Sequence, residues 1–200
     1  TLDAFSGIQS EGGPKARGHQ KLIMGPWTHA VGASPSGELT FPNAENPPNK
    51  ANDLIRQVEY YLKGNKTGED KDPAVTYYVM GDTFDPKAPG NEWRTADSWP
   101  PVKSTATPLY LTHENTLTQD LPVKAEKLRY RYDPSNPVPT IGGPQLTIPA
   151  GPRNQQSIES RNDVLVFTSE PMKEPIEITG KVNMNLWAAI DVPDTDFIAR

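Results

Sequence analysis

The run Lys21-Leu22-Ile23-Met24 lies between a polar, glycine-containing segment and the pair Gly25-Pro26. A short apolar run with such boundaries is typical of a strand that is buried on both faces, as in a parallel sheet. Five residues after Met24 the chain reaches His29. Enzymes of the α/β class place catalytic groups on loops that leave the carboxyl ends of parallel strands. His29 is therefore the first candidate functional residue.

Two amphipathic helices are expected around this strand. Leu2, Phe5 and Ile8 recur at a spacing of three and predict the end of a helix over residues 1–10. A second helix is predicted by the apolar face of residues 54–62, with Asn49 or Asn52 as its cap and Lys63-Gly64 at its end. Helix, strand and helix in this order are typical of α/β proteins.

After Pro73 the pattern becomes that of a β protein. The chain contains 22 prolines, about twice the average usage, so much of it must form turns, edges and loops. Short strands joined by loops rich in proline and glycine favour a β-sandwich over residues 73–200. The strands are expected at residues 75–80, 108–112, 128–132, 163–168, 176–179 and 182–190.

Several segments together resemble one enzyme family. Lys21–His29 is similar to the catalytic-histidine segment of the cocaine esterase / α-amino acid ester hydrolase family. That family includes the glutaryl cephalosporin acylases and is related to the X-Pro dipeptidyl-peptidases. Further segments of the family occur in the same order: Tyr61–Gly64, Tyr77–Gly81, Glu92–Arg94, Trp99-Pro100, Asp163–Phe167, Leu186-Trp187 and Asp194–Phe197.

The resemblance implies a fold and a division into domains. Residues 1–72 would be the C-terminal part of an α/β-hydrolase catalytic domain. Residues 73–200 would be a mainly-β jelly-roll sandwich of the galactose-binding type. The chain would then be a fragment, cut within the hydrolase domain in front and within the sandwich behind.

The resemblance also implies a serine hydrolase that cleaves ester or amide bonds through an acyl-enzyme. His29 would be its general base, because imidazole can take the proton of a serine and return it to the leaving group. The serine and the acid of the triad would lie upstream of Thr1, in the remainder of the catalytic domain, and this chain alone would be inactive.

Other candidates for the triad are weaker. The sequence has no Gly-x-Ser-x-Gly motif, in which the nucleophile of this fold sits. The nearest approach, Gly32–Gly37, has Ser36 in place of the second glycine, and both Ser34 and Ser36 follow His29, which is the wrong order. Asp3 lies within the first helix, whereas the family's acid precedes that helix.

Two other classes of function stay open. One is a carbohydrate-binding module that uses Tyr77, Tyr78, Trp93 and Trp99 as a platform, although core packing is the commoner use of such rings. The other is an oligomerisation module, in which this chain would pair with copies of itself.

We expect no cofactor and no metal. The cluster Asp191, Asp194 and Asp196 lacks the glycine and the distant glutamate of an EF-hand loop, and a turn followed by a strand is the commoner structure. His19 and His113 lie in polar loops without ligand spacing. Glu159, Arg161 and Asp163 alternate, and an arginine held between two carboxylates would be structural.

Bulk properties narrow the partners. The net charge is −5 and no cluster of Lys and Arg occurs, which argues against nucleic acid. No apolar run is long enough to span a membrane. The chain has no cysteine, so disulfides do not indicate the compartment, and a secreted or periplasmic location stays open.

Overall fold

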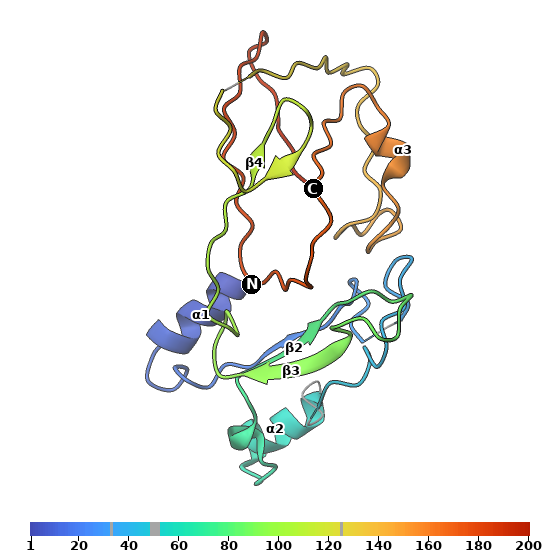
Figure 1. Cartoon of the computed structure of the whole chain (residues 1–200). Helices are drawn as coiled ribbons and strands as arrows, with labels where there is room; N and C mark the ends of the chain where they lie inside the picture. Colours follow the sequence, from blue (N-terminus) through green and yellow to red (C-terminus); the bar gives the residue numbers. More distant parts are fainter. Residues whose placement is uncertain (33, 49–52, 125) are drawn as a thin grey trace.

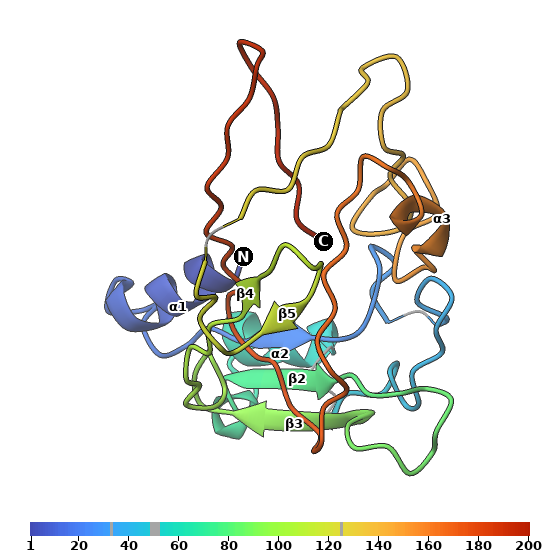
Figure 2. The same cartoon turned by 45° about the horizontal axis from the view of Figure 1, so that its top comes forward.

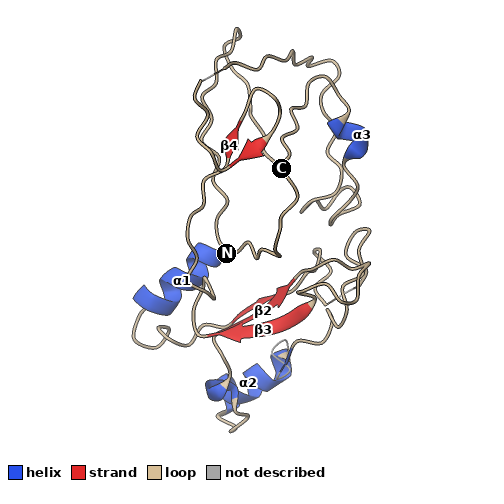
Figure 3. Ribbon diagram, in the orientation of Figure 1, coloured by secondary structure: helices blue, strands red, loops and turns tan. Residues whose placement is uncertain are grey.

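The computed structural model describes residues 1–32, 34–48, 53–124 and 126–200 (Figure 1). The two sheets are small, and loops make up most of the chain after residue 97 (Figure 3). The elements, in chain order, are α1 (Leu2–Glu11), β1 (Leu22–Met24), α2 (Leu54–Lys63), the 3-10 helix η2 (Glu69–Lys71), β2 (Val75–Val79), β3 (Glu92–Ala96), β4 (Tyr110–Leu111), β5 (Leu117–Thr118) and α3 (Gln156–Glu159).

The larger sheet has the strand order β1-β2-β3. β1 and β2 are parallel, with Met24 opposite Tyr77, and β2 and β3 are antiparallel, with Tyr78 opposite Trp93. The parallel strand predicted at residues 21–24 is therefore confirmed. β2 comes from the segment expected in the sandwich, yet it pairs with β1. The division at residues 72 and 73 itself stays a prediction.

The central strand β2 is buried on both faces because its side chains alternate between two clusters. Val75 and Tyr77 pack with Phe5 of α1 and Leu22 of β1 on one face. On the other face Tyr78 packs with residues 41–44, including Phe41 and Ala44. α1 therefore covers one side of the sheet and the 41–44 segment covers the other.

The helix α2 forms where the apolar periodicity predicts it, but with a different cap. The Oδ1 atom of Asp53 accepts a hydrogen bond from the backbone N–H of Arg56 at 3.1 Å. Asn49 and Asn52, the expected caps, lie outside the described residues. Gly64 ends the helix with a φ of 71°, as expected of a glycine in the left-handed region. The apolar face of α2 is exposed, with Leu62 79% accessible.

The second half of the chain contains fewer strands than predicted. β4 confirms part of the strand expected at 108–112 and pairs with β5. The predicted strands at 128–132, 163–168, 176–179 and 182–190 are wrong, because these residues lie in irregular structure. Alternating side chains favour a strand, but a strand also needs a neighbour for its hydrogen bonds. Among the residues described, only the bridge from Thr168 to Thr116 supplies one to these segments.

The regular structure described after residue 73 is mainly β. The described helices are too short to cross a lipid bilayer.

Candidate functional site

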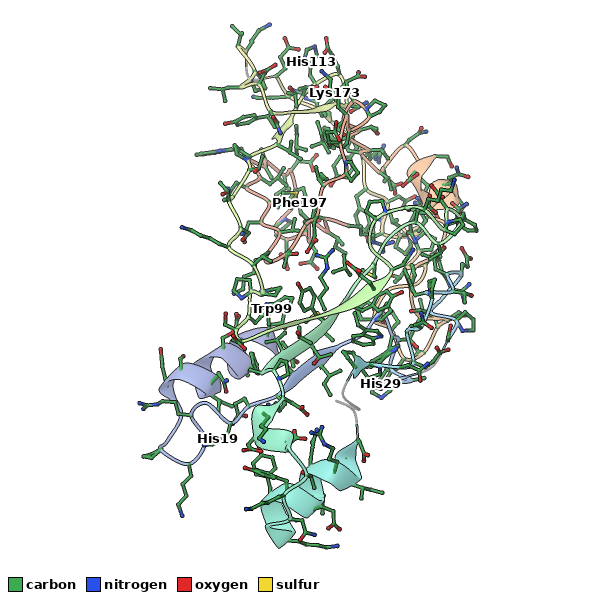
Figure 4. The ribbon with its side chains drawn as sticks, turned by 60° about the horizontal axis from the view of Figure 1, so that its bottom comes forward. His19, His29, Trp99, His113, Lys173 and Phe197 are labelled. Carbon is green, nitrogen blue, oxygen red and sulfur yellow. The ribbon has the colours of Figure 1, made fainter. Side chains whose placement is uncertain are left out.

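His29 lies on the loop that leaves the carboxyl end of β1, and its side chain is exposed. Figure 4 shows His19 and His29 on either side of β1, one before and one after the strand. The imidazole of His29 makes no hydrogen bond or ion pair with any residue that the structure describes. His29 therefore lies exposed on the loop after β1, where the sequence places it, and its catalytic role stays a prediction.

The chain bends directly after β1 at Pro26, and Gly25 precedes the bend. A Cβ atom at this position would lie 2.3 Å from Cε2 of Trp27, which is far inside the van der Waals distance. Glycine therefore allows the indole of Trp27 to fold back over the end of the strand. Trp27 lies two residues before His29, so the packing of Trp27 limits where the loop can place His29.

Three aromatic side chains hold the 42–44 segment, which is bonded to this loop through Trp27. The hydroxyl of Tyr78 donates to the carbonyl of Pro42 at 2.6 Å, Nε1 of Trp93 donates to that of Asn43 at 2.9 Å, and Nε1 of Trp27 donates to that of Ala44 at 3.0 Å. We call Tyr78, Trp93 and Trp27 the carbonyl clamp. They come from β2, β3 and the His29 loop respectively. Three successive carbonyls are thereby paired, which fixes the segment to the sheet.

The rings of the carbonyl clamp also contact one another. The centroids of Trp27 and Trp93 are 5.6 Å apart, and those of Tyr78 and Trp93 are 5.3 Å apart in an edge-to-face arrangement. Such pairs add to the energy of burial. Burial also raises the pKa of Tyr78, so its hydroxyl keeps the proton that it donates.

The weaker triad candidates have other environments. Asp3 is exposed and pairs with Nζ of Lys181 at 2.9 Å, and this partner lowers the pKa of the Asp3 carboxyl. Ser36 is buried, and its backbone N–H donates to the carbonyl of Leu39. Neither residue forms a hydrogen bond or ion pair with His29 in the described part of the chain.

The aromatic residues of the alternative sugar platform are used in packing. Tyr77 and Tyr78 are buried, and Trp99 packs edge-on against Tyr77 at 6.3 Å. Trp93 contacts Trp27 and Tyr78 as a member of the carbonyl clamp. The four rings therefore do not form one exposed surface.

Arg161 forms a structural network, although not with the expected pair of carboxylates. Its Nε and Nη2 atoms donate to the two carboxylate oxygens of Asp163, both at 2.7 Å. Nη2 also donates to the carbonyl of Asn136 at 2.7 Å. The second partner is thus Asn136 and not Glu159.

No metal centre is found in the described part of the chain, where no group of three or more His, Asp or Glu side chains could hold an ion. Asp191, Asp194 and Asp196 are exposed. His113 lies 3.4 Å from Glu126 and 3.8 Å from Glu114, as expected for a surface histidine near acidic residues.

Tyr78 and Trp93 hold the 42–44 segment next to the His29 loop, a role that was not predicted from the sequence. One signal could have indicated it. Both residues carry a polar group at the end of an apolar ring, and such rings usually find a partner when buried. The partner carbonyls lie in the proline- and asparagine-rich loop 42–46, which has few backbone partners of its own.

Comparisons with known proteins give a consistent result. The chain is 30% identical over 193 residues to the cocaine esterase of Rhodococcus sp. (strain MB1 Bresler), a match that covers 90% of this chain and 32% of that protein. The crystal structure of an aminopeptidase from a marine sediment archaeon, Thaumarchaeota archaeon, matches with a TM-score of 0.56 and 28% identity, over 78% of this chain and 25% of that one. This chain therefore spans about a third or less of the length of these relatives.

Both relatives are hydrolases by name. A family match covers residues 65–200, which begin after α2 and do not include His29. Because this match covers more than half of the chain, the family is established. The chain belongs to the family of the X-Pro dipeptidyl-peptidase C-terminal non-catalytic domain, and it is similar in sequence to a cocaine esterase.

Proposed function

We propose that this chain is part of a serine hydrolase that cleaves ester or amide bonds through an acyl-enzyme, and that His29 is its general base. The observation that carries the proposal is the exposed imidazole on a loop leaving a parallel strand. Chemistry in α/β enzymes takes place at that end of the sheet. The hydrolase names of the relatives support the reaction class.

His29 would act twice in each turnover. It first takes the proton of the serine hydroxyl as the oxygen attacks the scissile carbonyl, and then returns this proton to the leaving group. In the second half of the reaction it takes a proton from water in the same way. A carboxylate on its other ring nitrogen would fix the tautomer, and both serine and carboxylate would come from outside these 200 residues.

The proposal includes the remainder of the catalytic domain as a partner. β1 is an edge strand among the described residues, and its free edge could accept a further parallel strand. The apolar face of α2, with Leu54, Ile55 and Leu62 exposed, offers a surface for the same domain. In this arrangement residues 1–72 end an α/β-hydrolase domain, and a jelly-roll sandwich follows them.

A fluorophosphonate probe tests the proposal on the full-length protein, because it labels only an activated serine. The wild-type protein should be labelled, and His29→Ala should lose both labelling and ester turnover. His19→Ala is the matched control, because His19 is also exposed but precedes β1. Full labelling of His29→Ala would show that another group is the base.

A further inference from the structure

The connection between β2 and β3, residues 80–91, leaves the same end of the sheet as the His29 loop. Because β1 and β2 are parallel, the residues that follow Met24 and Val79 lie at the same end of the sheet. Figure 2 shows the loops after both strands at this end. Residues of the connection are therefore candidates to contact a substrate that reaches His29.

The base of this connection is held firmly. The backbone N–H of Gly81 donates to Oδ1 of Asn91 at 3.1 Å, and Nδ2 of Asn91 donates to the carbonyl of Asp82 at 2.7 Å. A Cβ atom at Gly81 would lie 2.3 Å from the carbonyl oxygen of Pro89, so the two sides of the connection pack closely. The N–H of Phe84 donates to Oδ1 of Asp82 at 2.8 Å, which fixes the backbone at Phe84.

The strand β3, which follows the connection, packs against the His29 loop. Trp93 follows Asn91 by two residues, and its ring lies 5.6 Å from that of Trp27. Trp27 in turn precedes His29 by two residues. The end of the connection and the start of the His29 loop are therefore each within two residues of the Trp27–Trp93 contact.

Two large apolar side chains project from this firm base. Phe84 is 85% exposed and Met80 is 62% exposed. Their neighbours in the chain are charged, namely Asp82, Asp85 and Lys87. The pattern differs from α2, whose apolar face is continuous and suits packing against protein. Small-molecule sites combine apolar side chains with a few placed polar groups, and Phe84 and Met80 supply apolar groups at the end of the sheet where the His29 loop begins.

We propose that Phe84, together with Met80, is a specificity-determining residue that contacts an apolar group of the ester or amide substrate. This inference rests on the proposed function, because it places the scissile bond beside His29. The apolar group can belong to the acyl part or to the leaving group, and two series of esters distinguish these sources.

The test compares kcat/KM in the full-length protein for wild type, Phe84→Ala, Phe84→Leu and Leu121→Ala. The acyl series uses p-nitrophenyl phenylacetate and p-nitrophenyl acetate, and the leaving-group series uses phenyl acetate and methyl acetate. Phe84→Ala should lower the preference for the apolar ester about tenfold in one series, the scale expected for an apolar contact in a pocket. Phe84→Leu should keep most of the preference. Leu121→Ala removes another exposed side chain and should change nothing.

Two results would overturn the inference. One is a preference for the apolar ester that is unchanged in both series. This result is also expected if Phe84 packs against another part of the full-length protein, in which case Phe84→Ala lowers stability only. The other is an equal loss for all four esters, which would mean a general structural role. If His29→Ala remains active, the proposed function itself fails. If His29→Ala is inactive and Phe84→Ala keeps its preferences, only the role of Phe84 fails.

Discussion

Trp27 and Trp93 lie with their ring centroids 5.6 Å apart, and their indole N–H groups donate to the carbonyls of consecutive residues, Ala44 and Asn43. One indole belongs to the His29 loop and the other to β3. The loop that carries His29, the 42–44 segment and the sheet are therefore joined to one another. Mutations in this unit should affect catalysis through the position of His29, which is a different effect from general destabilisation.

Trp27→Phe in the full-length protein tests this coupling. The change removes the donor to Ala44 and keeps an aromatic ring, so the apparent free energy of unfolding should fall by about 1 kcal/mol. The kcat for ester hydrolysis should fall more than KM changes, because His29 loses its fixed position. Trp99→Phe is the control, since Trp99 packs on Tyr77 in the other cluster. Equal losses of kcat in both variants would contradict the coupling.

Gly25→Ala tests the turn that starts the loop. The new Cβ atom would collide with the Trp27 ring, so the indole must move and the bond to Ala44 must weaken. Hydrolysis should drop at least about tenfold, as expected when a catalytic group is displaced by an ångström or so. Gly13→Ala is the matched control, because nothing lies within 4 Å of a Cβ atom there. Tryptophan fluorescence reports the movement of the ring, and an unchanged spectrum with full activity would refute the account.

The elements of the N-terminal part of the chain were predicted well from the sequence, because the local signals agree there. The apolar run at β1, the periodicity of α2 and the left-handed Gly64 each specify their element without distant partners. Asp53 replaces the predicted caps because it directly precedes the first helical residue. The strand β3 was not predicted, since its alternation of polar and apolar residues is weak and its pairing with β2 stabilises it.

The strands of the C-terminal part of the chain were harder to predict, because strand pairing depends on two segments and not on one. Residues 182–190 alternate well enough to suggest a strand, yet they have no ladder partner in the described structure, and Trp187 is fully exposed. For the site, the sequence predicted the loop that carries His29, and the catalytic role of His29 stays a prediction. It could not predict the carbonyl clamp, because the acceptor carbonyls lie 36 residues from Tyr78 and 50 residues from Trp93, and such separations leave no local pattern.

An ion-pair network that joins α2 to η2 should contribute to the stability of the fold. Nη1 of Arg56 lies 3.4 Å from Glu69 and also pairs with Asp72, and the Glu69 side chain is only 4% exposed. Arg56→Met should lower the apparent free energy of unfolding by about 3 kcal/mol, because it leaves a buried carboxylate without its partner. Lys63→Met removes the largely exposed cation paired with Glu59 and should cost less than about 1 kcal/mol. Urea unfolding of both variants checks the order, and a larger loss for Lys63→Met would contradict it.

The pair formed by Arg161 and Asp163 predicts a dependence of stability on pH. Hydrogen bonds from Arg161 lower the pKa of the Asp163 carboxyl below its ordinary value of 3.8. A group with a lowered pKa stabilises the folded state above its unfolded pKa, and the contribution is lost as the pH falls through the folded pKa. Asp163→Asn should therefore be less stable than wild type at neutral pH, and the difference should shrink below about pH 4. Urea midpoints between neutral and acidic pH measure it, with the exposed Asp97→Asn as the control. A difference that stays constant into strong acid would mean that packing, and not the charge of Asp163, is responsible.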